Sequence, residues 1–311
     1  MDKIFFIGLI IGMVSRLIML NLDQKQYPSQ PNILTSQIVL AFVASALGAL
    51  LIPALISRSY TSITFLSLAA EQFRKVRSNR RNALQELEPT QLVSRGKSFI
   101  EEIARTYEIR NYMCIVTSFV TVAIFYGLSN EGGFSDNSAI IISTIGGLAL
   151  AFILRKLLSR QCIADIAEVS IVDISFVDGT LLKVGNLKGI TNVGLKRDRE
   201  RYLKYGIGIE IRPKNNSYKN AGILSYPGQR QVICYNLYSR LGVRRENNEP
   251  AFTPIPRKDP VSQALYIAFI PMEMDERKVI EAVKSCPVLD SARGKNLALK
   301  NLKIEGEEGN K

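Results

Sequence analysis

Histidine, the side chain most often used in acid–base catalysis, is absent from this chain of 311 residues. Its absence excludes Ser-His-Asp and Cys-His catalysis, zinc sites built with histidine and haem ligation through histidine. The chain has four cysteines, none of which forms a C-x-x-C pair: Cys114, Cys162, Cys234 and Cys286. This spacing favours reduced, mostly buried thiols over a disulfide framework, with a lone nucleophilic cysteine as the sharper alternative.

Two further patterns fall short of a chemical motif. Gly189–Gly194 has the G-x-x-x-x-G spacing of a phosphate-binding loop, but Leu195-Lys196 follows where that motif needs Lys and then Ser or Thr. The nearest group of acidic residues lacks the paired spacing of a metal or glycosidase site, and it consists of Asp165, Glu168 and Asp173. We therefore predict no catalytic residue, no metal site and no cofactor. A membrane-anchored enzyme that works without histidine stays a second alternative.

Four apolar stretches dominate the first half of the chain, at residues 4–20, 33–56, 113–128 and 138–154. A hydrocarbon core about 30 Å thick needs roughly 20 mostly apolar helical residues to cross it. The second stretch meets this length, and the other three need flanking residues. Since the first stretch has a weakly basic start and no small-x-small cleavage site, we interpret it as a retained span rather than a signal peptide.

We predict an α-helical membrane domain with four transmembrane helices, followed by a small cytosolic α+β domain. The membrane domain covers residues 1–158 and includes a cytosolic helical loop at 57–112, the α+β domain covers 159–293, and 294–311 is a flexible tail. Alternating apolar residues predict strands at 169–177, 180–184, 206–211, 231–238 and 264–270. Asp178-Gly179 predicts a hairpin turn, Asp275 predicts the cap of a helix that ends near Lys284, and 244–260 is predicted as a loop.

Basic residues gather in the loops that this scheme places in the cytoplasm, as the positive-inside rule requires. Ser57–Tyr112 carries ten Lys and Arg residues, and Arg155 and Lys156 follow the fourth stretch, whereas Ser129–Asn137 has none. We therefore predict a multi-pass protein of the bacterial inner (cell) membrane with both termini in the cytoplasm. Arg16 then lies near the outer end of the first span, where it reaches the interface or acts as a functional intramembrane arginine.

The charge balance indicates the kind of partner. The net charge is +12, and residues 155–311 carry most of it, with 27 basic and 18 acidic side chains. We expect a lipid bilayer with anionic headgroups and unidentified membrane or cytosolic proteins as partners. Nucleic acid ranks last, because few aromatic residues interleave with the basic run at 196–204. Gly8 and Gly12 form a G-x-x-x-G pair that favours close helix packing, and a homo-oligomer stays open.

Residues 59–88 are predicted to form a long amphipathic helix with a basic middle. The basic side chains are Arg74, Lys75, Arg77, Arg80 and Arg81. Such a helix beside a membrane span can lie among anionic headgroups, where each basic group contributes on the order of 1 kcal/mol. The alternative is a cytosolic helix that packs on the soluble domain.

A second helix, predicted at Lys97–Arg110, runs on into the third apolar stretch and carries a short motif. Its residues Phe99-Ile100-Glu101-Glu102-Ile103-Ala104 resemble the motif of the YIEGIA family, with Phe99 in place of Tyr and Glu102 in place of Gly. Other similar segments are Gln26-Tyr27-Pro28, Ile52–Leu55, Thr64–Leu66, Gln72–Arg74 and Arg110-Asn111-Tyr112. The resemblance implies a multi-span membrane protein of endospore-forming Firmicutes, associated with the forespore, without an established chemistry. The candidate residues that it carries over, in an unknown role, are Phe99, Ile100, Glu101, Ile103, Ala104, Arg110 and Asn111.

These observations favour a non-enzymatic scaffold or recruitment factor at the cytosolic membrane face of sporulating bacteria. A component of a membrane transport or conduit system is the alternative. The last three apolar stretches contain only Ser, Thr and Gln37 as polar groups, which disfavours charged or proton cargo.

Overall fold

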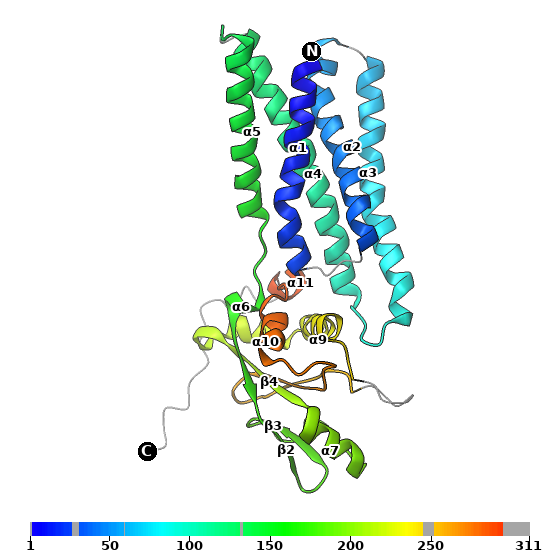
Figure 1. Cartoon of the computed structure of the whole chain (residues 1–311), viewed down its shortest axis with the longest axis vertical. Helices are drawn as coiled ribbons and strands as arrows, with labels where there is room; N and C mark the ends of the chain where they lie inside the picture. Colours follow the sequence, from blue (N-terminus) through cyan, green and yellow to red (C-terminus); the bar gives the residue numbers. More distant parts are fainter. Residues whose placement is uncertain (1, 27–30, 59, 131–132, 245–251, 295–311) are drawn as a thin grey trace. The chain divides into compact units, whose positions relative to one another are not determined.

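The computed structural model describes residues 2–26, 31–58, 60–130, 133–244 and 252–294 (Figure 1). The chain forms two compact units. The helical unit consists of Met1–Leu84 and Ile103–Ser159, and the C-terminal unit consists of Gln85–Glu102 and Arg160–Lys311. The predicted tail beyond residue 294 lies outside the described residues.

The helical unit is built from five long helices. They are α1 (Asp2–Gln26), α2 (Pro31–Ile56), α3 (Tyr60–Leu87), α4 (Lys97–Asn130) and α5 (Asp136–Leu158). Within the described part of the chain, four of them, α1, α2, α4 and α5, are long and apolar enough to cross a membrane. The predictions of a long helix over 59–88 and of a second helix that continues into the third apolar stretch are confirmed.

Small residues let these helices approach one another closely. A Cβ atom added to Gly48 of α2 would collide with the backbone carbonyl of Ile115 on α4. One added to Gly147 of α5 would collide with the Thr121 side chain, whereas Gly127 of α4 has open space. Gly48 of α2 and Gly147 of α5 therefore let their helices pack closely against α4. A larger side chain at either position would push the helices apart.

Three buried clusters fix the directions of the helices. Ile4 of α1 packs with Ala49 of α2 and Val122 of α4 at one end of the bundle, and Met19 packs with Met113 of α4 and Ala151 of α5 nearer the other end. Residue numbers therefore rise along α1 as they fall along α4, so these two helices are antiparallel. Contacts of Ala44 with Cys114 and of Ala49 with Val122 show that α2 and α4 are parallel.

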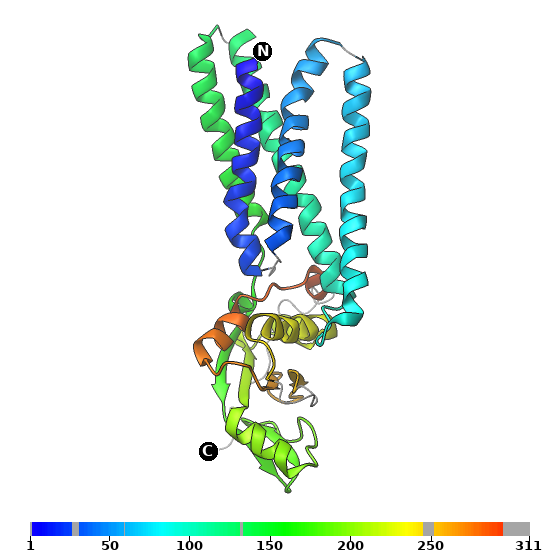
Figure 2. The same ribbon diagram turned by 45° about the vertical axis from the view of Figure 1, so that its right-hand side comes forward.

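This arrangement differs from the predicted topology. Four spans with both termini on one side of a membrane require the first and third spans to be parallel, but α1 and α4 are antiparallel. The difference arises because α3 runs back along the bundle antiparallel to α2, as Figures 1 and 2 show, and returns the chain to the end at which α2 begins. Hydropathy did not reveal this pass, since the second half of α3 is strongly charged.

The C-terminal unit contains a four-stranded antiparallel sheet in the order β1-β4-β6-β5 and a β2–β3 hairpin. The strands are β1 (Ala167–Val172), β2 (Ile174–Val177), β3 (Leu181–Val184), β4 (Ile207–Pro213), β5 (Ile255–Lys258) and β6 (Leu265–Phe269). The α-helices are α6 (Ile163–Ile166), α7 (Lys196–Tyr205), α8 (Tyr218–Ser225), α9 (Pro227–Leu241), α10 (Glu276–Lys284) and α11 (Asp290–Gly294). Two short 3-10 helices are η1 (Glu88–Thr90) and η2 (Lys214–Asn216).

The sheet is buried on both faces. Ile209, Ile211 and Ile267 alternate on one face and are fully buried. On the other face, Tyr266 and Ala268 belong to a core cluster that includes Leu182 and Val184 of the hairpin. α9 contacts β5 and α10, and α10 also contacts β1. For this reason the sequences of the central strands β4 and β6 are nearly continuous runs of apolar residues.

Most strand predictions are confirmed, and three corrections concern 169–177, 231–238 and the loop at 244–260. The predicted strand at 169–177 is divided into β1 and β2, and Asp178 and Gly179 adopt the positive φ angles, 53° and 78°, that suit a two-residue hairpin turn. The strand predicted at 231–238 is wrong, because this segment lies inside α9, whose first residue is Pro227. The loop predicted at 244–260 contains the edge strand β5. Its Pro256 and its two basic residues are typical of edge strands but do not give an alternating apolar pattern.

The predicted cap of α10 is confirmed. The Asp275 carboxylate accepts hydrogen bonds from the backbone N–H groups of Arg277 and Lys278, at 3.0 and 3.2 Å. These bonds satisfy two of the N–H groups that a helix leaves without intrahelical partners at its first turn.

Candidate functional site

The first turns of α4 carry the motif residues and belong to the C-terminal unit. Phe99 and Ile100 are buried, with 2% and 1% of their surface exposed. The Phe99 ring lies 6.1 Å from the Tyr235 ring of α9, centroid to centroid, and the Ser98 and Tyr226 hydroxyls are 3.3 Å apart. The motif therefore packs against α9 rather than facing solvent.

Glu102 forms an ion cluster on the same turns of α4. Its carboxylate pairs with Arg160 and accepts a 3.1 Å hydrogen bond from the backbone N–H of Asp290. The Arg160 guanidinium also lies 3.5 Å from the Asp290 carboxylate. Glu102, which sequence comparison marks only as a departure from the family motif, thus joins α4 to α11 and to the residue that begins the C-terminal unit after α5.

The loop before α4 is fixed to α9 by polar contacts. The Arg95 guanidinium lies 4.9 Å from the centroid of the Tyr235 ring and 3.7 Å from the Glu88 carboxylate. Glu88 also accepts a 2.7 Å bond from the backbone N–H of Gly96. Gln231 of α9 donates a 2.8 Å bond to the Ser94 carbonyl. Burial raises the pKa of Tyr235, which keeps its phenol neutral at physiological pH.

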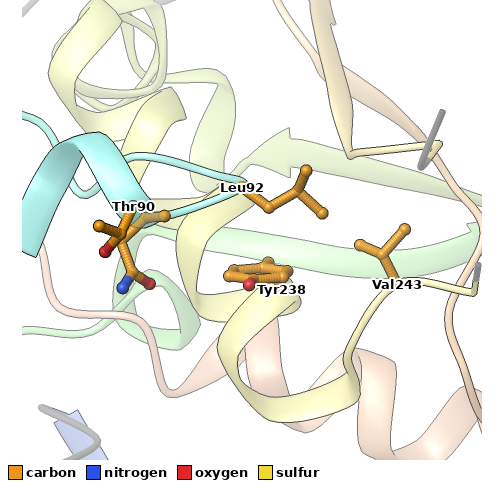
Figure 3. Close-up of a pocket in the computed structure, with 5 residues that line it drawn as sticks. Thr90, Leu92, Tyr238 and Val243 are labelled. Atoms are coloured by element: carbon orange, nitrogen blue, oxygen red, sulfur yellow. The ribbon is translucent and has the colours of Figure 1, made fainter. Parts of the chain in front are cut away.

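A cavity of about 510 Å³ opens where this loop meets the end of α9. Its lining consists of Thr90, Gln91, Leu92, Tyr238 and Val243. Figure 3 shows the Tyr238 ring with the Leu92 and Val243 side chains near it, and Thr90 on the other side of the view. Among the residues that the structure describes, no carboxylate or amine lines it, and its accessible lining is mainly polar, so the cavity offers hydrogen-bonding groups with a smaller apolar contribution. Sequence analysis did not find this site, because 146 residues separate Leu92 from Tyr238.

The predicted membrane-surface residues of α3 divide into two groups. Arg77 pairs with the Glu108 carboxylate at 3.3 Å, and the Arg80 guanidinium lies 4.9 Å from the Tyr107 ring centroid. Both residues therefore contact α4. Lys75 is exposed and Arg81 is partly buried, and the side chain of Arg74 lies outside the described residues. A role at the membrane surface stays a prediction for this group.

The remaining motif residues lie on both sides of the boundary between the units. In the helical unit Ala104, Arg110 and Asn111 are buried, with 0%, 2% and 4% exposed, and Ile103 is half-buried. Glu101, which belongs to the C-terminal unit, is half-buried as well. The predicted motif helix is thus a single structural element whose residues pack in two separate units.

Arg16 lies in the interior of the helical unit, with 3% of its surface exposed. Its Nη2 atom donates a 2.7 Å hydrogen bond to the side-chain oxygen of Gln37, and its guanidinium lies 5.9 Å from the Tyr107 ring centroid. The burial of Arg16 does not match the predicted role in which its side chain extends to the membrane interface. The other predicted role, that of a functional intramembrane arginine, stays a prediction. Gln37 is the one amide in the second apolar stretch, and this could have identified the partner from sequence.

The groups that could do nucleophilic or metal chemistry are mostly buried or dispersed. Cys234 and Cys286 are buried, and burial raises the pKa of Cys234 to about 12 and that of Cys286 well above its ordinary value. Such neutral thiols are poor nucleophiles. Within the described ranges, no three His, Cys, Asp or Glu residues are placed to hold a metal ion. Asp165 instead accepts a 2.8 Å bond from the backbone N–H of Cys162.

Comparison with known proteins places the chain in a family. The model of the YIEGIA protein family matches residues 4–299. The chain belongs to the YIEGIA family. A curated member, the uncharacterized protein YphB of Bacillus subtilis (strain 168), is 34% identical over 285 residues, which cover 92% of this chain and 91% of YphB. No solved structure matches the chain significantly. Since the YIEGIA match includes nearly all of both units, the helical unit and the C-terminal unit are both parts of the family's fold.

Proposed function

We propose that this YIEGIA protein is a multi-pass membrane protein whose C-terminal unit acts as a non-enzymatic scaffold or recruitment factor at the cytosolic membrane face. Four long apolar helices support the membrane location. Arg155 and Lys156 in the last turn of α5 support a cytosolic position for the chain that follows. A forespore-associated setting in sporulating cells, implied by the family resemblance, is part of the proposal.

The observation that carries this proposal is the cavity lined by Leu92, Tyr238 and Val243. Its mainly polar lining, which includes Thr90 and Gln91, and its smaller apolar part at Leu92 and Val243 suit one or two side chains of an amphipathic segment from a partner protein. The two sides of the cavity come from the loop before α4 and from α9, which the Arg95–Tyr235 and Gln231–Ser94 contacts hold together. A site built in this way is formed before a partner binds, which lowers the entropic cost of binding.

The proposal is tested by placing a photo-activatable phenylalanine at Tyr238 in the full-length protein and irradiating sporulating cells. We expect a discrete protein adduct at position 238 that disappears when Leu92→Trp fills the cavity. Tyr218 on α8, with 36% of its surface exposed, is the matched control position and should give no such adduct. The absence of a protein adduct at 238, or the same adduct at 218, would contradict recruitment through this cavity.

Transport is a second candidate, favoured by the buried Arg16 and by buried hydroxyls at the centre of the bundle. Two of these hydroxyls donate hydrogen bonds within the protein, however. Ser118 donates a 2.8 Å bond to the Ser45 carbonyl, and Thr121 donates one of the same length to the Thr117 carbonyl. Solute flux through purified protein in liposomes that is lost in Arg16→Ala would support transport and overturn the scaffold proposal.

A further inference from the structure

The path of α3 through the helical unit can be measured against α4. Ile52, near the end of α2, packs in the cluster that contains Phe125 of α4, and α3 begins at Tyr60, shortly after α2 ends. At the other end of the bundle, Arg77 of α3 pairs with Glu108 of α4. Arg77 follows Tyr60 by 17 residues, and Phe125 follows Glu108 by 17, or roughly 26 Å of helix in each case. α3 therefore runs beside α4 over a distance close to the thickness of a hydrocarbon core, about 30 Å.

The first half of α3 exposes an uncharged surface. Tyr60 and Leu68 are 81% and 57% exposed, whereas Leu66 is buried at 8%. Further exposed side chains on this half carry hydroxyl groups, namely Thr61, Ser62, Thr64 and Ser67. No charged residue occurs between Arg58 and Glu71. The Thr64 hydroxyl donates a 2.9 Å bond to the carbonyl of Tyr60 in the same helix, which satisfies it where water is absent.

The other helices of the bundle expose large apolar side chains. Exposed large apolar side chains occur on the four candidate spans, for instance Phe42 and Leu50 on α2, Val116 on α4 and Ile145 on α5. Lipid acyl chains are the partner that fits this number of exposed large apolar side chains, because soluble proteins rarely expose large apolar patches to water.

The two ends of the bundle differ in charge. At the end where α2 meets α3, the basic residues are Arg58 in the turn and Lys3 at the start of α1. At the opposite end lie Arg80 on α3, close to Tyr107, and Arg155 and Lys156 in the last turn of α5. By the positive-inside rule, this basic end is the cytosolic one.

From these observations we infer that α3 crosses the membrane as a fifth segment, with lipid on the exposed uncharged side of its first half, so that the chain starts outside and α5 ends in the cytosol. The inference rests on the membrane location proposed above. The uncharged part of α3, residues 60–70, spans only about 17 Å of helix. Local thinning of the bilayer and long basic side chains that extend to the headgroups compensate for this short length.

Cysteine labelling distinguishes this topology from four spans with both termini inside. In a variant whose four native cysteines are replaced by alanine, single cysteines are introduced as Ser57→Cys, Ser135→Cys and Ser262→Cys. All three positions are exposed. We expect an impermeant maleimide to label residues 57 and 135 in intact cells and residue 262 only after permeabilisation. Protection of residue 57 together with labelling of residue 135 would overturn the fifth segment while leaving the membrane location intact.

A further labelling position, residue 3, gives a second test of the topology that does not depend on the variant at residue 57. Lys3→Cys, at the start of α1, should also be labelled from outside, whereas the four-span topology places it in the cytosol. Protection of both residue 3 and residue 57 would contradict the inference. Release of the full-length protein from membranes by alkaline carbonate, without detergent, would instead remove the membrane location itself, so the two failures are separable.

Discussion

Arg16 of α1 and Gln37 of α2 form a 2.7 Å hydrogen bond in the interior of the helical unit. The two residues are 3% and 5% exposed. The Arg16 guanidinium also lies 5.9 Å from the Tyr107 ring of α4, so one side chain joins three helices. A charge within an apolar stretch is therefore accommodated by contacts inside the protein.

The first prediction concerns this pair. Gln37→Leu removes the acceptor of a charge-assisted hydrogen bond and should lower the free energy of unfolding by about 1.5–3 kcal/mol. Gln37→Glu keeps an acceptor of similar size and should preserve stability. The measurement is the temperature at which detergent-purified protein loses its monodisperse peak in size-exclusion chromatography. Equal melting of Gln37→Leu and the wild type would show that the hydrogen bond contributes nothing.

The second prediction compares two glycines in the bundle. Gly48→Ala places a Cβ atom against the Ile115 carbonyl, which belongs to a helix backbone and cannot rotate away. We expect a loss of about 1–3 kcal/mol from overpacking. Gly127→Ala is the matched control, since a Cβ atom there has open space and alanine favours the helix by about 1 kcal/mol. The same thermal assay should rank Gly127→Ala at or above the wild type and Gly48→Ala below it; the reverse order would refute this packing argument.

Local signals in the sequence predicted the elements that depend on neighbouring residues. Asp275 has a side chain that can cap a helix, and it directly precedes a helical pattern. Asp178-Gly179 is a turn sequence, and it is flanked by the paired strands β2 and β3. The segment 231–238 was misassigned because alternation of apolar residues over a short run fits a strand and a buried helix alike. Pro227-Gly228, a helix start, was the signal that could have decided the case.

The candidate site depends on contacts between distant residues, which patterns along the chain cannot supply. Composition identified Arg77 as basic, but its partner Glu108 lies 31 residues away. The motif helix was predicted, yet the contact of Phe99 with Tyr235 joins positions 136 residues apart. The path of α3 along the bundle was missed for a related reason, since α3 is held beside α4 by contacts of Arg77 and Arg80 and has no long apolar stretch.

The third prediction concerns the ion cluster of Glu102, Arg160 and Asp290. Glu102→Ala leaves the largely buried guanidinium of Arg160 without its main carboxylate partner, and we expect a cost of about 3–5 kcal/mol in the C-terminal unit. Hydrogen exchange of the full-length protein should show faster exchange in α11 and at the start of α4. The double variant Glu102→Met, Arg160→Met removes both charges and should recover most of the protection. If the double variant exchanges as fast as Glu102→Ala, the loss does not come from a stranded charge.

The fourth prediction concerns alkaline pH. The Tyr266 hydroxyl donates a 2.8 Å bond to the Glu210 carboxylate, and burial together with this bond raises the pKa of Tyr266 to about 12, from an ordinary value of 10.0. Because the folded state holds this proton more tightly than the unfolded state, the contribution is fully present below pH 10 and is lost as the pH rises toward 12. Burial also raises the pKa of Cys234 from 9.0 to about 12, which adds a loss that begins near pH 9.

The measurement is the denaturant midpoint of the detergent-solubilised protein, followed by circular dichroism from pH 8 to pH 11.5. The wild type should become less stable with increasing steepness above pH 9. Tyr266→Phe should be less stable than the wild type at pH 8, because Glu210 loses a hydrogen-bond donor, and should decline less steeply between pH 10 and pH 11.5. Cys234→Ala should weaken the part of the decline that starts near pH 9. Parallel curves for the wild type and Tyr266→Phe would mean that the phenol does not couple its proton to folding, and that the Tyr266–Glu210 contact is only a packing contact.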